Sequence, residues 1–406
     1  MNEEKTSASL NAVFRRWQNL APVAMIVGFL GMALSFFLEK SPGNKAFWSH
    51  YLYGFLFWLS LTLGCTTLTF LHHTIRSHWS LSILRIAEAG NKNLPTMAIL
   101  FVFIGLGAIL GHSVYPWANP EILHHLHPNK QLWYNPVFWS LRAFGYFAYW
   151  IFTTGKMNQS SAKQDETQDE RMGEIRAGQA APLGVIHVVV LTLAYTDWLM
   201  SLDPNWFSTI YGAWHMATQV LATIAFGTFL VLTLRKYKPY SEIVTPVLTK
   251  DLGNMMLGFT MIWGYFTLSQ FLIIWSANLP EEIAFFVGRF RGPLVFVGAF
   301  LVVMQFFGPF LCLLAGRTKR TFELLQKVAA WIFLMRIVDS WWQIVPFLRR
   351  DPLANFGLLF DLTAFVGIGG VWAWGFFKNL RTLDVIPAHD SRLQEARAKL
   401  EAHHHA

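Results

Sequence analysis

The sequence predicts an all-α membrane protein with ten transmembrane helices, and three observations support this fold class. Of the 406 residues, 54% are hydrophobic and only 14% are charged, whereas soluble domains average roughly a quarter charged residues. The apolar residues fall into ten runs, each close to the ~20 residues that a helix needs to span hydrocarbon. The basic residues concentrate in alternate connections between these runs. The net charge of +8 is therefore a topology signal, and we expect no nucleic-acid partner.

The ten runs divide the chain into a tail of residues 1–18, an integral membrane domain of residues 19–378 and a tail of residues 379–406. We expect the helices to form two four-helix bundles with two further helices flanking them. The predicted spans are 19–38, 47–71, 95–115, 133–155, 182–201, 206–234, 249–276, 289–315, 321–346 and 354–378.

The distribution of basic residues orients these spans. Together with the span residues next to them, the two tails and the even-numbered connections hold 22 Lys and Arg residues, and the opposite connections hold 7. Because basic residues accumulate in cytoplasmic loops, both termini are expected in the cytoplasm. Residues 1–18 are polar and no cleavage pattern follows them, so we expect the first helix to remain as an anchor.

Three connections carry further expectations. The segment 156–181 contains a mixed-charge polar stretch and is expected to be mobile. Residues 74–90 are expected to form an amphipathic helix on the inner surface, with Ile and Leu side chains toward lipid and Arg85 toward water. The outer connection 113–132 is rich in Pro, Trp and His and is expected to offer a docking surface to an extracytoplasmic partner.

Ionisable residues inside the spans are the candidate functional residues, because a charge in hydrocarbon costs at least a few kcal/mol. Aspartate and histidine can exchange protons near neutral pH when burial and neighbours shift their pKa, which indicates a two-stage proton path. Its candidate residues in the middle or outer half are Asp197, His112, His215, Asp339 and Asp361. Toward the inner end the candidates are His187 and Asp251, with His72, His73 and Lys327 at similar depth.

Two arginines within the spans are expected to be structural or pocket charges. Arg336 and Asp339 are three residues apart on one helix and can neutralise each other, so a structural pair and a relay both remain open. Arg142 has no acid nearby in the sequence, and Asp197 at similar depth is its expected partner. Such a pair would either brace the bundle or flank a quinol pocket.

Asp203 is expected to have a structural role. It precedes Pro204 at the start of the sixth predicted span, and Asp followed by Pro is typical of a helix N-cap with proline in the first helical position.

No metal site is predicted. Cys65 and Cys312 lie in apolar runs without partners at metal-ligand spacing. The histidines of the outer connection lie in a loop that offers no fixed scaffold for a metal. These residues are His124, His125 and His127.

A dihaem cytochrome b is a rival interpretation. His112 could pair with His215, and His72 or His73 with His187, because each pair lies at matching depth. Against this, the chain does not place two histidines on each of two facing helices.

Two blocks of sequence carry a resemblance to a known family. Between the fifth and sixth spans the chain reads Tyr195-Thr196-Asp197-Trp198-Leu199-Met200-Ser201-Leu202-Asp203-Pro204-Asn205-Trp206-Phe207-Ser208-Thr209-Ile210-Tyr211-Gly212. The second block is Tyr115-Pro116-Trp117-Ala118, followed by Trp133-Tyr134-Asn135-Pro136, Arg142 and Tyr146-Phe147. Both blocks resemble the polysulfide-reductase membrane-subunit superfamily in its alternative complex III branch. The resemblance covers essentially the whole chain, including the count of ten spans with both ends inside.

The resemblance implies the second of two homologous membrane subunits in a quinol:cytochrome c or oxidase-linked oxidoreductase. It implies a location in the bacterial inner membrane, no covalently bound cofactor here, a proposed proton route, and haem and iron–sulfur clusters on partner subunits. In such complexes the first homologue is the better candidate for quinol oxidation, and contact of this subunit with quinol or menaquinol stays open. The implied partners are the homologous membrane subunit, an extracytoplasmic iron–sulfur subunit, c-type haem subunits, small membrane subunits, a terminal oxidase and lipid.

Two other classes of function remain open. The chain could be an assembly scaffold that holds the outer subunits without proton or quinol chemistry. It could also be a stand-alone transporter, although the sequence has no evident pair of broken helices in corresponding halves.

Overall fold

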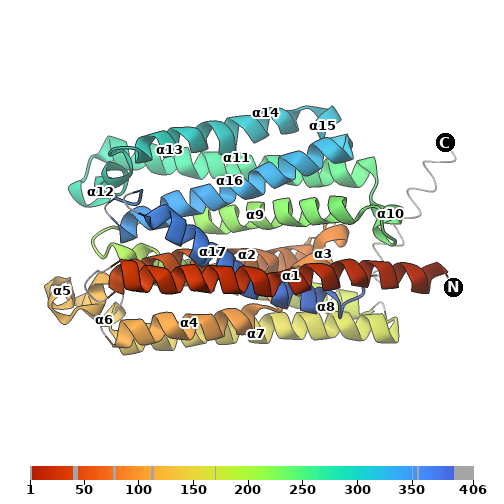
Figure 1. Cartoon of the computed structure of the whole chain (residues 1–406), viewed down its shortest axis with the longest axis horizontal. Coiled ribbons are helices and arrows are strands. Elements are labelled where there is room, and N and C mark those ends of the chain that lie inside the picture. The colour runs from red at the N-terminus through yellow and green to blue at the C-terminus, as the bar shows by residue number, and fades with distance from the viewer. Residues whose placement is uncertain are drawn as a thin grey trace.

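The computed structural model describes residues 2–39, 44–75, 79–110, 114–169, 171–349, 351–353 and 356–387. Within these ranges the chain forms helices and no strand, as the sequence predicts. The long helices lie side by side along one common direction (Figure 1).

Eight helical segments are long and apolar enough to cross a membrane, which indicates a multi-pass membrane protein. One of them is continuous through three labelled parts, α13 (Leu294–Leu301), the π-helical η4 (Val302–Phe307) and α14 (Gly308–Leu314). The other seven are α1 (Asn2–Leu38), α2 (Lys45–Thr74), α8 (Arg171–Trp198), α9 (Tyr211–Leu234), α11 (Pro246–Ala277), α16 (Phe322–Leu348) and α17 (Gly357–Leu380).

Two further predicted spans correspond to helices that do not by themselves meet the length and apolarity expected of a membrane span. The third corresponds to α4 (Leu94–Ile109), which follows α3 (Leu81–Asn91) at a bend of 40°, and the pair counts as a ninth span only if taken together. The fourth corresponds to α7 (Pro136–Thr167), which is not among the eight. Its first half contains Arg142 and several Trp and Tyr residues, and its second half is polar.

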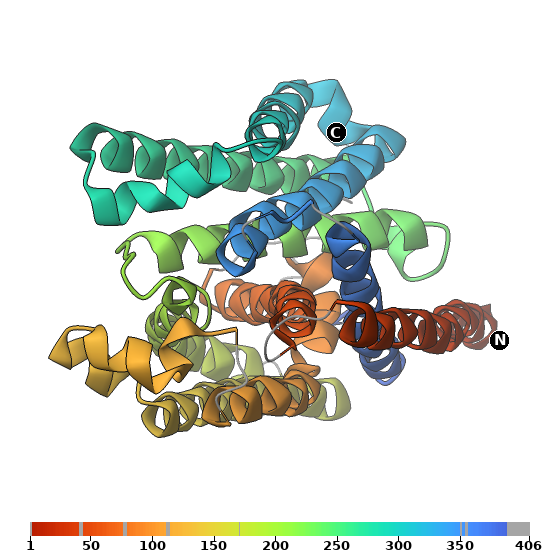
Figure 2. The same ribbon diagram turned by 60° about the vertical axis from the view of Figure 1, so that its left-hand side comes forward.

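The helices pack in two groups of four. One group consists of α2, α4, α7 and α8, and the other of α9, α11, the α13–α14 segment and α16. α2 joins the groups because it also contacts α9 and α16. α1 and α17 lie against each other at one edge (Figure 2), and α17 packs on α2.

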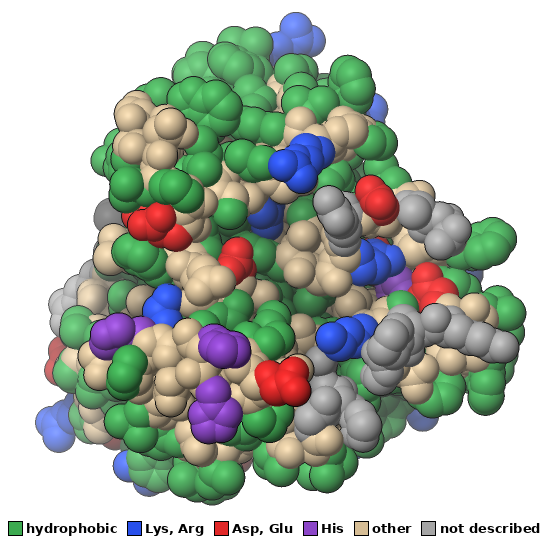
Figure 3. Space-filling model, turned by 90° about the vertical axis from the view of Figure 1, so that its left-hand side faces the viewer, with side chains coloured by type: hydrophobic (Ala, Val, Ile, Leu, Met, Phe, Trp, Pro, Cys, Tyr) green, Lys and Arg blue, Asp and Glu red, His purple; other side chains and the backbone are tan. Residues whose placement is uncertain are grey.

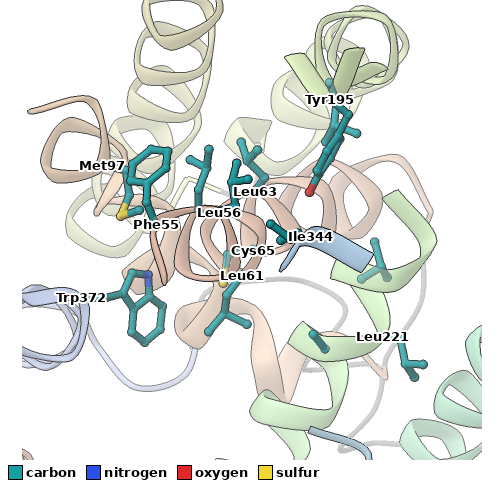
Figure 4. Close-up of a cluster of buried hydrophobic side chains, with 14 of the residues drawn as sticks. Phe55, Leu56, Leu61, Leu63, Cys65, Met97, Tyr195, Leu221, Ile344 and Trp372 are labelled. Carbon is teal, nitrogen blue, oxygen red and sulfur yellow. The ribbon is translucent and has the colours of Figure 1, made fainter. Parts of the chain in front are cut away.

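The core surrounds α2, most of which is buried. Figure 4 shows Phe55, Leu61 and Cys65 of this helix among buried side chains from both groups, including Leu221 of α9 and Ile344 of α16. The two groups therefore share one continuous core.

Short helices cover the two ends of the long ones. The outer connection is not an open loop, because it folds into η2 (Pro116–Ala118), α5 (Pro120–His125) and α6 (Pro128–Trp133). The remaining short elements are η3 (Met200–Leu202), α10 (Tyr240–Ile243), α12 (Pro280–Arg289) and α15 (Gly316–Arg320).

The structure corrects the expected surface helix at 74–90. Every residue of α3 is buried, and Arg85 is only 1% exposed. Its guanidinium pairs with Glu88 at 2.7 Å and with Asp165 of α7. Ser161 also accepts a hydrogen bond from it, at 2.9 Å. These partners satisfy the charge, so a helix that looks amphipathic in the sequence lies between other helices.

The segment 156–181 is also not the expected polar loop. α7 continues to Thr167 and α8 begins at Arg171, so the connection is short. Arg176 is buried and donates hydrogen bonds to the side chain of Gln164 and, at 2.9 Å, to the carbonyl of Ser160. Contacts between the two helices hold the polar stretch in helical form.

A close approach of α1 to α17 depends on glycine. A Cβ added to Gly28 would lie 2.2 Å from the Cα of Gly367. Such close approach of small residues is typical of helix pairs in membranes.

We expect Gly28→Ala to separate these helices and to lower the free energy of unfolding by about 1–3 kcal/mol, as overpacking does. The matched control is Gly258→Ala in α11, where an added Cβ meets nothing within 4 Å. Thermal unfolding in detergent measures both variants, and equal melting temperatures would contradict the close packing of α1 on α17.

Candidate functional site

Asp197 and Arg142 form the ion pair that the sequence predicts. Asp197, near the end of α8, is fully buried. Arg142 of α7 binds its carboxylate with two nitrogens: Nε donates to Oδ2 at 2.8 Å and Nη2 donates to Oδ1 at 2.9 Å. This bidentate geometry fixes the orientation of both side chains.

Further donors surround the same carboxylate. Trp133 Nε1 donates to Oδ1 and the Tyr146 hydroxyl donates to Oδ2, both at 2.8 Å. The guanidinium of Arg142 also lies over the Trp133 ring, 4.1 Å from its centroid. Its remaining nitrogen, Nη1, is buried and has no hydrogen-bond partner among the described residues. That N–H group is available to water or to a substrate oxygen.

The two blocks of the family resemblance meet at this carboxylate. Tyr115 donates a hydrogen bond to the carbonyl of Trp198 at 3.0 Å, and Trp139 donates to the carbonyl of Asp197 at 2.9 Å. Both rings are buried and pack on Trp117. The outer segment therefore fixes the end of α8 that carries Asp197.

The predicted helix cap at Asp203 is wrong. No helix begins at Pro204, because the chain continues as a turn and irregular segment until α9 starts at Tyr211. Asp203 instead follows η3, and its carboxylate accepts a hydrogen bond from the Asn205 backbone N–H at 3.1 Å. The Asp-Pro pair therefore forms a turn, which uses the same local hydrogen bond as a cap.

His187 belongs to a hydrogen-bonded chain in the middle of α8. Trp150 Nε1–H donates to its Nδ1 at 3.1 Å, so Nε2 carries the proton and donates to Thr67 at 2.9 Å. Thr67 also accepts from Gln219 at 3.3 Å, and Gln219 accepts from the Tyr195 hydroxyl at 3.1 Å.

These hydrogen bonds bear on the alternative interpretation of the chain as a dihaem cytochrome b. Because both ring nitrogens of His187 are hydrogen-bonded, neither is free to bind iron in this structure. His72, one of its possible partners, has Nδ1 within 2.6 Å of the Ser80 hydroxyl. His187 therefore does not fit a haem ligand here.

His215 lies between two tyrosine rings. Its ring centroid is 4.6 Å from that of Tyr195 and 4.4 Å from that of Tyr211. Its Nε2 is buried without a hydrogen-bond partner among the described residues. α9, which carries His215, packs against α16.

Arg336 and Asp339 form the second predicted ion pair, and both are buried. Oδ2 of Asp339 accepts from Arg336, from Trp263 at 3.3 Å and from Gln343 at 2.9 Å. Because Trp263 belongs to α11, its hydrogen bond to Asp339 joins α11 to α16.

Asp361 is the centre of a third cluster, and the sequence analysis named only Asp361 among its members. Its Oδ1 lies 2.6 Å from Nδ1 of His50, and Nε2 of His50 lies 2.7 Å from Glu39. Its Oδ2 accepts from Trp341 at 2.7 Å and from Arg349. Asp361 and His50 are fully buried, whereas the Glu39 side chain is 19% exposed.

The remaining predictions have less support. Asp251 is only partly buried near the start of α11 and makes no hydrogen bond or ion pair with the described residues. His112 lies outside the described residues. The sequence analysis missed His50, although a histidine inside a predicted span was a usable signal. It also missed the buried ion pairs of Arg85, which only the position of α3 reveals.

One end of the molecule presents a mixed surface. Figure 3 looks onto the end where α5, α6 and α12 lie, and shows charged and histidine side chains scattered among hydrophobic ones. Within the part of the chain that the structure describes, no group of three or more His, Cys, Asp or Glu residues could hold a metal ion.

No protein-family model matches this chain, and no curated protein shows significant similarity to it. The fold and the site define its class without a relative. It is a multi-pass helical membrane protein whose described residues include buried charge clusters around Arg85, Asp197, Asp339 and Asp361.

A double-mutant cycle tests the Asp197 cluster. Arg142→Met leaves a buried carboxylate without its cation, and we expect it to cost about 3–5 kcal/mol of stability. Arg142→Met combined with Asp197→Leu removes both charges and should recover at least half of that loss. Denaturant unfolding in detergent measures the cycle, and strictly additive losses would show that the two side chains do not interact.

The His50 bridge is tested by His50→Phe, with His125→Phe in the exposed part of α5 as the matched control. The first variant removes two hydrogen bonds to carboxylates and should destabilise the protein by about 3 kcal/mol. The control should change its stability by less than about 0.5 kcal/mol. A similar melting temperature for both variants would contradict the bridge.

Proposed function

We propose that this chain is an integral membrane subunit of a respiratory quinol:cytochrome c or oxidase-linked oxidoreductase of the alternative complex III type. It spans the bacterial inner membrane with ten helices and keeps both termini in the cytoplasm. It contributes a proton-translocation path and a quinol-facing surface, while haem and iron–sulfur clusters are on its partner subunits.

The Asp197 cluster is the observation that carries this proposal. Its carboxylate, its paired arginine and the Tyr146 hydroxyl come from the two sequence blocks that resemble the family. A proton bound by Asp197 would weaken its pairing with Arg142, so proton transfer and the position of the guanidinium are coupled. The free Nη1–H of Arg142 offers a hydrogen bond to a quinone or water oxygen.

Buried polar groups support a route for protons between the two helix groups. The hydrogen-bonded chain from His187 through Thr67 and Gln219 reaches Tyr195, which stacks on His215. Several further buried polar atoms have no hydrogen-bond partner among the described residues, and such atoms commonly bind internal water. They belong to Tyr211, Thr260, Gln305 and Gln343.

One observation favours the alternative function as a transporter. α3 and α4 form a broken helix pair, and the buried α3 carries Arg85 and Glu88. A transporter of the inverted-repeat type would place a matching break in the second half. Among the described residues, no second bent pair of this kind is found. Purification of the native complex distinguishes the two, because a subunit of an oxidoreductase should co-purify with haem and iron–sulfur proteins.

Asp197→Asn in the intact complex tests the proposed function. We expect the rate of quinol oxidation, or the number of protons released per quinol, to fall by at least about tenfold while assembly continues, as loss of a positioned proton-transfer group predicts. The control is Glu166→Gln, which removes an exposed carboxylate of α7 that makes no ion pair with the described residues.

The scaffold alternative predicts a different result. It requires Asp197→Asn to lower the yield of assembled complex and to leave the turnover of each assembled complex unchanged. Unchanged yield together with unchanged turnover and proton release would contradict the proposed role of Asp197.

A further inference from the structure

A large apolar cavity lies in the second helix group, away from the Asp197 cluster. It has a volume of about 560 Å³ and is bounded by α11, α12, α13, η4 and α16. Most of its walls are aromatic or aliphatic side chains. Leu268 of α11 and Phe307 of η4 line it and are also exposed at 58% and 50%. The cavity therefore reaches the apolar outer surface between these helices.

The local backbone makes room for this cavity. η4 is a π-helical turn within an otherwise α-helical span, and such turns are frequent at functional sites. Gly264 and Gly298 line the cavity at positions where a side chain would crowd a neighbouring aromatic ring. A Cβ on Gly264 would lie 2.5 Å from the ring of Phe306.

Two polar groups on the cavity wall have unused hydrogen-bonding capacity. Asp339 lines the cavity and is 1% exposed, and all three of its hydrogen bonds with described residues involve Oδ2. Its Oδ1 accepts none from the described residues. The hydroxyl of Thr267, also on the wall, is buried and has no hydrogen-bond partner in the described part of the chain. A ligand with hydroxyl donors would satisfy the free carboxylate oxygen.

The chemistry of the wall selects one kind of ligand. The phosphate of a phospholipid or the carboxylate of a fatty acid would bring a negative charge toward the Asp339 carboxylate, which is unfavourable in an apolar site. A neutral ring with hydroxyl donors and a long apolar tail fits both the aromatic wall and the lateral opening.

We propose that this cavity binds an isoprenoid quinol, with one ring hydroxyl donating to Oδ1 of Asp339 and the tail leaving between α11 and α13. The proposal rests on the proposed function, since it names quinol as the ligand, and it places a quinol site in the second helix group. Asp339 then accepts a hydrogen bond that an oxidised quinone cannot donate. The site therefore prefers the reduced form.

The test measures binding by the full chain in phosphatidylcholine nanodiscs, with decylubiquinol and decylubiquinone as probes under argon. Isothermal titration calorimetry should give one site per chain and about tenfold tighter binding of the quinol, the scale of one hydrogen bond to a charged group. Val302→Trp fills the cavity and should weaken quinol binding by at least about tenfold. Val303→Trp is the matched control, because Val303 is the adjacent exposed valine and does not line the cavity.

Asp339→Asn provides a second, independent variant. The amide can donate to a quinone carbonyl as well as accept from a quinol, so the preference for the reduced form should fall below about threefold. Circular dichroism checks that each variant is folded.

Three outcomes would overturn the proposal: equal binding of quinol and quinone, equal effects of the two valine substitutions, or retention of phospholipid alone in the cavity by mass spectrometry. The isolated chain suffices for this measurement. Its failure therefore leaves the turnover test at Asp197 unaffected, and failure of that test leaves the binding result standing.

Discussion

The need to pair each charge buried between apolar helices with an opposite charge or with hydrogen-bond acceptors constrains the rest of the structure. Arg142, Arg336 and Arg85 are all largely or fully buried, and each lies against a carboxylate. An unpaired charge at these positions would cost several kcal/mol, so the helices must meet where the pairs can form. The pair of Arg142 and Asp197 joins α7 to α8, and the cluster around Asp339 joins α11 to α16.

The same pairs that hold helices together are suited to proton chemistry. Asp361 is bridged by His50 to Glu39, so a carboxylate in the interior is connected to one near the surface. Asp197 receives two hydrogen bonds from arginine and one from the Tyr146 hydroxyl. In both clusters a single proton changes how many favourable contacts the neighbours can make. Structural bracing and proton transfer are therefore compatible roles for one cluster.

The chain combines a rigid centre with irregular segments at the places where polar groups collect. α2 is surrounded by both helix groups and supplies much of the common core. The bend between α3 and α4 and the π-helical turn of η4 interrupt regular helices. α3 carries buried ion pairs, and η4 borders the apolar cavity with Asp339 on its wall. Departures from ideal helix geometry thus coincide with the buried polar groups.

The sequence by itself determined the helical class, the approximate positions of the long apolar helices and two ion pairs. Length and apolarity are local properties, and the pair of Arg336 and Asp339 is fixed by helical spacing. A charged Arg142 within the membrane needs an acidic partner at the same depth, and this requirement predicted Asp197.

Only the tertiary structure decided which charged residues are buried by other helices. Arg85 lies on a segment with an amphipathic pattern but is enclosed, because Asp165 of α7 neutralises it. Arg289 is the first residue of a predicted span, yet it is buried and donates to the carbonyls of Phe285, Trp342 and Gln343. His50 belongs to a buried cluster because it hydrogen-bonds to Asp361, which is 311 positions away in the sequence. Such contacts depend on how distant helices pack, and no local pattern in the sequence specifies that packing.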